Sequence, residues 1–132
     1  MSAPTKAIGV PFKVHVVGTL TNKTWAGDFR AKHLLTFRDK MNADRLRREL
    51  IGDAQGGIDV EAAAAAMVIS QLSVRLTETP EWWKEAKGGL DLEDPNVLEV
   101  VYKTTMKVED DYLQKVEAEG QAAQNALREE KK

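Results

Sequence analysis

The side chains that could carry out chemistry in this chain are few and isolated. Ser2, Ser70 and Ser73 are its serines, and none lies in the glycine-flanked turn that exposes a serine nucleophile. His15 and His33 lie far apart, without the paired spacing of a zinc-binding helix. The chain has no cysteine, which excludes disulfides, thiolate ligands and cysteine nucleophiles. We therefore expect no enzyme activity.

Two acidic clusters and one glycine-rich stretch are the remaining candidates for a ligand site. The carboxylates at 91–94 and 109–111 offer oxygen ligands that suit calcium or magnesium. Pro95, however, stands where a calcium loop of the EF-hand type would place another ligand, so capping and solvation are the better explanations. The stretch "GDAQGG" at 52–57 lacks the lysine and hydroxyl of a phosphate loop. We expect neither a metal nor a cofactor.

A basic cluster stands at Arg45, Arg47 and Arg48 and could contact phosphates. No aromatic residue is interleaved with these arginines, acidic residues are spread through the chain, and the formal net charge is -2. The cluster is better read as a basic contact face of a helix, either solvated or touching another protein, and nucleic-acid binding is disfavoured.

The stretch "TETPEWWKEAKGG" at 77–89 places two tryptophans side by side in a chain with few aromatic residues. Adjacent residues of a helix diverge by about 100°, so Trp82 and Trp83 cannot face the same way. Pro80 suits the start of a short helical turn, and Gly88 and Gly89 end it. We expect a bounded junction between two helices.

At least one of these tryptophans is expected to be buried against the helix that carries Val68, Leu72 and Leu76. A protein-interface anchor and a small-molecule platform remain open alternatives for the pair. Leu90 and Leu92, just downstream, are further candidates for core or interface anchors.

The N-terminal region predicts an antiparallel β-hairpin over about 12–34. Phe12, Val14 and Val16 alternate with polar residues, a second alternation places Phe29 and Ala31 on one face, and the polar stretch "TNKT" offers a turn.

Helical patterns follow over about 37–51, 60–78 and 95–118. Thr36 and Asp39 form a capping-box pattern at the start of the first helix, and Gly52 follows its end. Asp59 is well placed to cap the second helix and Asp94 the third. We expect the first helix to bury the stripe Phe37, Met41, Leu46 and Leu50, and the alanine-rich second helix to be the core helix with the spine Ala64, Val68, Leu72 and Leu76.

The predicted fold is α+β and predominantly helical, with a small N-terminal hairpin, three main helices and a short tryptophan-containing turn. The 132 residues suit one domain over 1–119, followed by a C-terminal tail over 120–132 that is frayed or ordered only by a partner. No apolar stretch reaches the roughly 18 residues that span a bilayer, so we expect a soluble cytoplasmic protein without a membrane partner.

Three stretches carry a resemblance to a known family. They are "WAGDFRAKHLLTFRDKMNADRLRRELIG" at 25–52, "SQLSVRLTETPEWW" at 70–83 and "GGLDLEDPNVLEVVYKTTM" at 88–106. In this order they resemble the tail assembly chaperones of long-tailed bacteriophages, over most of the chain.

The resemblance implies a protein that coats the tape measure protein, keeps its long apolar helices soluble and recruits the major tail protein before the tail tube polymerises. It also implies action in the host cytoplasm and absence from the mature virion. A chaperone of this kind predicts either an exposed apolar groove for its client or self-association into a homo-oligomer. Family members are often made in two lengths by a programmed frameshift, and Lys131 and Lys132 are the positions where we would expect the slip.

Two alternatives remain open at this point. The chain could be a structural subunit of the phage neck or a tail-completion protein, which would be retained in the particle. A nucleic-acid-binding regulator, using Lys40 with the arginine cluster, is the less favoured alternative.

Overall fold

The computed structural model describes residues 9–52 and 59–130. Residues 1–8, 53–58 and 131–132 fall outside the described part, and with them Ser2, most of the glycine-rich stretch and the expected frameshift position. The expected α+β, predominantly helical fold is confirmed. In chain order the elements are β1 (Val10–Val17), β2 (Thr24–Ala31), α1 (Phe37–Ile51), α2 (Val60–Arg75), β3 (Leu76–Glu78), α3 (Glu81–Glu85), the 3₁₀ turn η1 (Lys87–Gly89) and α4 (Pro95–Glu130).

The predicted hairpin is present, and its register places Val14 opposite Gly27 and Phe12 opposite Phe29. Val14 and Phe29 are buried, as the two-residue alternation indicated. Strand β3 pairs antiparallel with the other edge of β2. Within the described residues the sheet therefore has the strand order β1-β2-β3.

The strand β3 corrects the expected end of the second helix. That helix was predicted to run to residue 78, but α2 ends at Arg75 and Leu76 adopts extended backbone angles. Pairing explains the change, because Leu76 lies opposite Ala31 and the Arg75 carbonyl accepts a 2.8 Å hydrogen bond from the Lys32 amide. Tertiary contacts with β2 thus override a helical local pattern.

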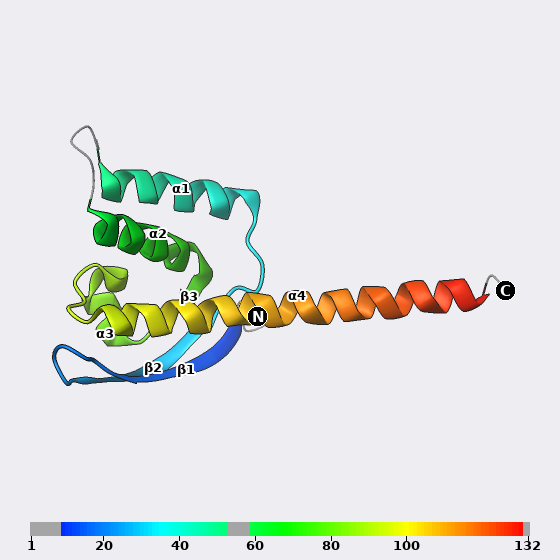
Figure 1. The fold of residues 1–132 in the computed structure, drawn as a ribbon, viewed down its shortest axis with the longest axis horizontal. Coiled ribbons are helices and arrows are strands. Elements are labelled where there is room, and N and C mark those ends of the chain that lie inside the picture. Colours follow the sequence, from blue (N-terminus) through cyan, green and yellow to red (C-terminus); the bar gives the residue numbers. More distant parts are fainter. Residues whose placement is uncertain (1–8, 53–58, 131–132) are drawn as a thin grey trace, which may run out of the picture.

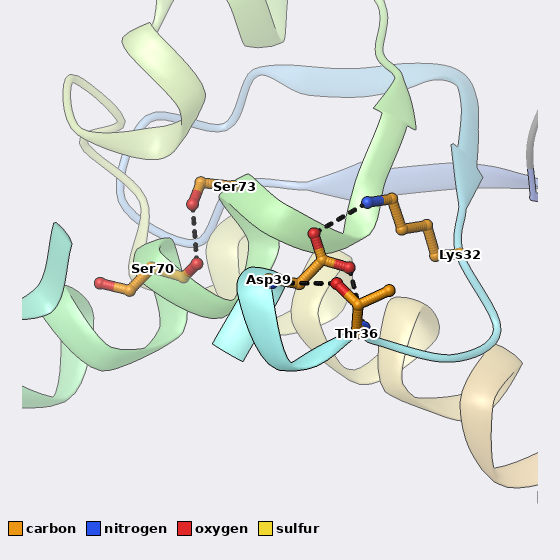
Figure 2. A network of polar contacts seen from close by, with 5 residues as sticks. All are labelled: Lys32, Thr36, Asp39, Ser70 and Ser73. Carbon is orange, nitrogen blue, oxygen red and sulfur yellow. Dashed lines mark hydrogen bonds and ion pairs between the residues drawn. The ribbon is translucent and has the colours of Figure 1, made fainter. Parts of the chain in front are cut away.

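The first turn of α1 has the predicted capping box. The Thr36 hydroxyl accepts from the Asp39 amide at 3.1 Å, and the Asp39 carboxylate accepts from the Thr36 amide at 3.0 Å. Figure 2 shows Lys32 reaching the same carboxylate, at 3.1 Å. The backbone N–H of Thr36 and then the Lys32 ammonium hold the pKa of Asp39 below its usual range. The turn between β2 and α1 is fixed by these three groups.

The predicted buried stripe of α1 is wrong in its first half. Phe37 is 80% exposed and Met41 is also exposed, whereas Ala43 is buried and Leu46 and Leu50 are partly buried. Phe37 and Leu46 are nine positions apart, which is about half a turn around a helix, so they cannot share a face. The face carrying Ala43 and Leu46 packs on α2, and the other faces solvent.

Helix α2 lies between α1 and the rest of the molecule (Figure 1). Its second half is buried at Ile69, Ser70 and Leu72. Ala64, the first residue of the predicted spine, is exposed instead, and Leu76 lies outside the helix. The expectation of a central helix is therefore correct for its second half, while its alanine-rich first half leaves one side open.

The core forms where the sheet, α2, α3 and the first half of α4 meet. Its buried apolar residues are Val14, Phe29, Leu72, Trp83 and Val101. They come from five elements, so each element contributes about one large side chain to a shared centre. Burial of each such side chain stabilises the fold by about 1.5–3 kcal/mol relative to its exposure.

Helix α4 begins at Pro95, as predicted, but continues to Glu130 rather than ending near residue 118. Residues 113–129 are all exposed, and Figure 1 shows this half of the helix projecting beyond the body of the molecule. Residues 120–129 of the expected tail are therefore helical, without contacts that bury them. Their dependence on a partner stays a prediction.

Asp94 is buried at the start of α4, the position where a helix cap is predicted, and its carboxylate accepts hydrogen bonds from the hairpin loop. It accepts from the Leu20 amide at 2.7 Å, from the Thr21 amide at 3.1 Å and from the Thr21 hydroxyl. Asn96 adds three contacts: it accepts from the Thr19 amide at 3.1 Å and from the Thr19 hydroxyl at 3.3 Å, and it donates to the Val17 carbonyl at 2.9 Å. The hairpin loop is thereby held against the N-terminus of α4.

Candidate protein-interaction groove

An open groove of ≈ 420 Å³ lies between residues 61–69 of α2 and residues 95–102 of α4. The loop from Gly89 to Glu93 lines it as well. Most of its lining is apolar, and we name it the α2/α4 groove. Its apolar lining residues are Ala64, Ala65, Val68 and Ile69 from α2, Leu90 and Leu92 from the loop, and Leu98 and Tyr102 from α4.

The groove exists because the side chains of α2 are small where it faces α4. Ala64 and Ala65 carry only a methyl group, so they leave space before Leu98 and Tyr102 on the opposite wall. The second half of α2 carries Ile69 and Leu72, which are buried. The alanine run therefore opens a hollow on this side of the helix.

The wall formed by η1 is held in place by Trp83. Gly89 has φ +106°, and a β-carbon there would come within 3.2 Å of Trp83 Cη2 and 3.1 Å of Leu98 Cδ1. The positive φ favours glycine here, and any larger residue would in addition make tight contacts with both side chains. Trp83 and the two glycines of the sequence motif thus lie together behind this wall of the groove.

The prediction that one tryptophan is buried is confirmed for Trp83, which is 4% exposed and belongs to the same cluster as Leu72. Its ring meets that of Phe29 edge to face, with centroids 5.7 Å apart. Trp82 is partly exposed, donates from Nε1 to the Ala26 carbonyl at 2.9 Å and lies against Trp25 at 5.1 Å. Trp83 is a core residue, and Trp82 covers the sheet beside it.

Leu90 and Leu92, proposed from the sequence as anchors, both line the groove. Leu90 is 52% exposed, so a large aliphatic side chain stands at the groove with little covering it. Leu92 is half-buried and packs against the core. An exposed leucine beside an apolar hollow is typical of an interaction surface.

Carboxylates surround the groove on both walls. Glu61 stands on α2, Glu93 in the loop and Glu99 on α4, and all three are exposed. Asp94 also borders the groove, but its carboxylate is engaged by the hairpin loop, and the Thr21 hydroxyl first and then backbone N–H groups lower its pKa. Among the described residues that line the groove there is no lysine or arginine.

The arginine cluster lies elsewhere, on α1, and is partly neutralised there. Arg47 and Arg48 both contact the Asp44 carboxylate, at 3.1 Å and 3.0 Å, and lower the pKa of Asp44. Arg45 donates to the Asn42 side chain at 3.0 Å. None of the three lines the groove.

The other residue types singled out from the sequence have structural roles. Ser70 and Ser73 donate to backbone carbonyls of α2, at 2.6 Å and 2.7 Å, the latter contact drawn in Figure 2. His33 stacks on Tyr112 at 4.3 Å. In the part of the chain that the structure describes, no three metal-ligating side chains come together, and no helix is long and apolar enough to cross a membrane.

A second hollow of ≈ 440 Å³ lies between the start of β1 and the middle of α4. Its lining combines Phe12 and Val108 with Lys107, Asp111 and other charged groups. Lys107 and Asp111 form an ion pair along its α4 wall at 2.8 Å. Mixed charges and an internal pair make it a poorer apolar receptor than the α2/α4 groove.

Sequence patterns missed four residues of the groove, namely Ala64, Ala65, Leu98 and Tyr102. The alanine run was the available signal, but its pattern predicts a core helix. Nothing local shows that its exposed side faces Leu98, because that pairing depends on how α4 returns over α2.

Comparison of the chain with protein-family models, with curated proteins and with solved structures gives no match.

Proposed function

We propose that this protein is a non-catalytic phage tail assembly chaperone. It binds an apolar helical segment of the tape measure protein, keeps that protein soluble and helps to recruit the major tail protein. The observation that carries the proposal is the α2/α4 groove, an open hollow with a mostly apolar lining at which Leu90 is 52% exposed. The resemblance in sequence supplies the identity of the client.

The groove suits a helix better than an extended peptide. Its walls are two helices, and an amphipathic helix binds such a groove by a row of side chains at i, i+3 or i+4, and i+7. An extended peptide gains affinity by pairing with a strand edge, and the described strands do not line this groove. Leu90 and Tyr102 would pack against the apolar side chains of the bound helix.

Co-expression with the tape measure protein tests the proposal. The wild-type chain should raise the soluble fraction of the client, because its apolar helices would be covered rather than exposed to one another. A variant with Ala64→Gln and Leu90→Gln places neutral amides in the groove and should lose most of this effect. An unchanged client solubility with the wild-type chain would contradict the proposal.

A matched control separates groove binding from a general loss of surface hydrophobicity. Ala62→Gln with Leu20→Gln makes the same chemical changes at exposed positions outside the groove. This control should support the client as well as the wild type does. Circular dichroism of both double variants checks that they are folded.

The runner-up function is a structural neck or tail-completion subunit. The exposed, projecting half of α4 favours it, since a long unpartnered helix also suits insertion into a particle. Mass spectrometry of purified virions distinguishes the two functions. A chaperone should be absent or scarce, whereas a structural subunit should be present in fixed proportion to the major tail protein.

A further inference from the structure

We infer that the α2/α4 groove selects helices whose aliphatic face is flanked by lysine or arginine. This inference rests on the proposed function, because it names the chemistry of the client held in the same groove. It concerns selectivity among helical clients, which the apolar lining alone does not provide.

The charges around the groove carry the inference. Glu61, Glu93 and Glu99 lie at its border, on both helix walls and in the loop, and all three are exposed. Among the described residues that line the groove, no basic side chain offsets them. A helix placed along the apolar lining would therefore bring its flanking side chains near carboxylates on either side.

One lysine lies close to this border without neutralising it. Lys103 contacts Glu99 at 2.6 Å, one turn along α4, and both side chains are more than half exposed. An exposed pair of this kind is weak and exchanges readily with another cation. Glu99 thus remains available to a lysine or arginine of the client.

The acidic border is a local property and does not follow from overall charge. The formal net charge of the chain is only -2, the arginines of α1 lie outside the groove, and the second hollow includes Lys107 and Lys115. Charge complementarity of this kind mainly raises the rate of association and the discrimination between partners. Salt should weaken it, because the groups concerned are exposed.

Three synthetic helices provide the test. Each is about 18 residues long, enough for about five turns, and carries the same leucine and isoleucine face. The positions flanking that face are lysine in the first peptide, glutamine in the second and glutamate in the third. Fluorescence anisotropy with the full chain gives Kd for each peptide at low and at high salt.

The lysine-flanked peptide should bind about tenfold more tightly than the glutamine-flanked one at low salt, and the glutamate-flanked peptide should bind most weakly. The triple variant Glu61→Gln, Glu93→Gln, Glu99→Gln should lose this order while it still binds the glutamine-flanked peptide. The matched control Glu81→Gln, Glu117→Gln, Glu119→Gln removes the same charge from exposed positions outside the groove and should keep the order.

Two results would overturn the inference, and they differ in what they say of the proposed function. Equal binding of all three peptides, lost in the Ala64→Gln, Leu90→Gln variant, would remove the charge selectivity and leave the groove as a helix receptor. Absence of binding by every peptide would remove both the selectivity and the groove as the receptor. The effect of the chain on tape measure solubility then decides the chaperone function independently.

Discussion

Single side chains in this protein connect positions that are far apart along the chain. Trp83 lies behind the groove wall at Gly89 and also meets Phe29 of the sheet. Asp94 starts α4 and holds the hairpin loop through Leu20 and Thr21. The Trp83 ring lies behind the groove wall at Gly89, and the buried Asp94 carboxylate fixes the hairpin loop at the start of α4. Both contacts help the groove to keep its shape.

Replacement of Trp83 by alanine should lower the free energy of unfolding by about 3–5 kcal/mol, since a buried aromatic ring leaves a cavity. Urea denaturation measures the change. Phe37→Ala is the control, because that ring is 80% exposed and its loss should leave stability nearly unchanged. Equal stability of the Trp83→Ala variant and the wild type would contradict a core role for this ring.

Asp94→Asn should destabilise the fold at neutral pH, because it removes the charge that the Thr21 hydroxyl and the backbone N–H groups stabilise. The folded pKa is lower than the unfolded one, so the contribution of the carboxylate is complete above about pH 4. It is lost as the pH falls through the lower, folded pKa. The difference in free energy of unfolding between wild type and variant should therefore stay constant between about pH 5 and about pH 8, and it should shrink at lower pH.

Thermal unfolding followed across this pH range measures that difference. Asp91→Asn is the matched control, since Asp91 lies in the same loop but is exposed. Its stability difference from the wild type should be small, because the side chain is exposed. A difference for Asp94→Asn that grows in acid would show that the sign of the linkage is opposite to the one inferred.

At the scale of elements, α2 determines the architecture, because it packs on α1 with one side and on the rest of the molecule with the other. Its side chains differ in role: Ser70 and Leu72 are buried in the core, whereas Ala64 and Ala65 border the groove. The ion pair between Arg75 and Glu109 joins the end of α2 to α4. Helix α2 thus links the outer helix, the core and the groove.

Local patterns predicted the elements that depend on local chemistry. The hairpin follows from alternating apolar residues, the start of α1 from Thr36 and Asp39, and the start of α4 from Pro95. The end of α2 could not be predicted in this way, because Leu76 becomes extended only by pairing with β2. The groove was missed for the same reason, since Ala64 and Leu98 come to line one groove only through the tertiary fold.

The ion pair between α2 and α4 leads to a prediction at this scale. Arg75 is 7% exposed, so Arg75→Met should leave the Glu109 carboxylate without its partner in a partly buried site and destabilise the fold by about 2–4 kcal/mol. The double variant Arg75→Met, Glu109→Leu should recover most of this loss, because no unpaired charge remains. Urea denaturation of both variants measures the two effects.

The control for that prediction is an exposed pair on the same helix. Lys107 and Asp111 are both mostly exposed, and Lys107→Met should change stability little. If Arg75→Met were equally harmless, the buried pair would have no structural role.

The whole molecule consists of a layered body and a projecting helix. The body contains α1, α2, the sheet, α3 and the first half of α4, and the projecting part is the exposed half of α4 (Figure 1). Leu113, Val116 and Leu127 are exposed along it. Because residues 113–129 are exposed, we expect the stability of the body not to depend on this part of the helix.

Removal of residues 120–132 should therefore leave the thermal midpoint within a few degrees of the full chain, since residues 120–129 are exposed and no part of the body packs over them. The helical circular-dichroism signal per molecule should fall, because the deleted segment includes helix up to Glu130. A second truncation, before Thr105, removes that buried residue and the Glu109 partner of Arg75, and should unfold or strongly destabilise the body. Rapid amide exchange in this segment is the result expected of a helix without tertiary support. A large loss of stability on removing residues 120–132 alone would instead show that the projecting helix packs against the body.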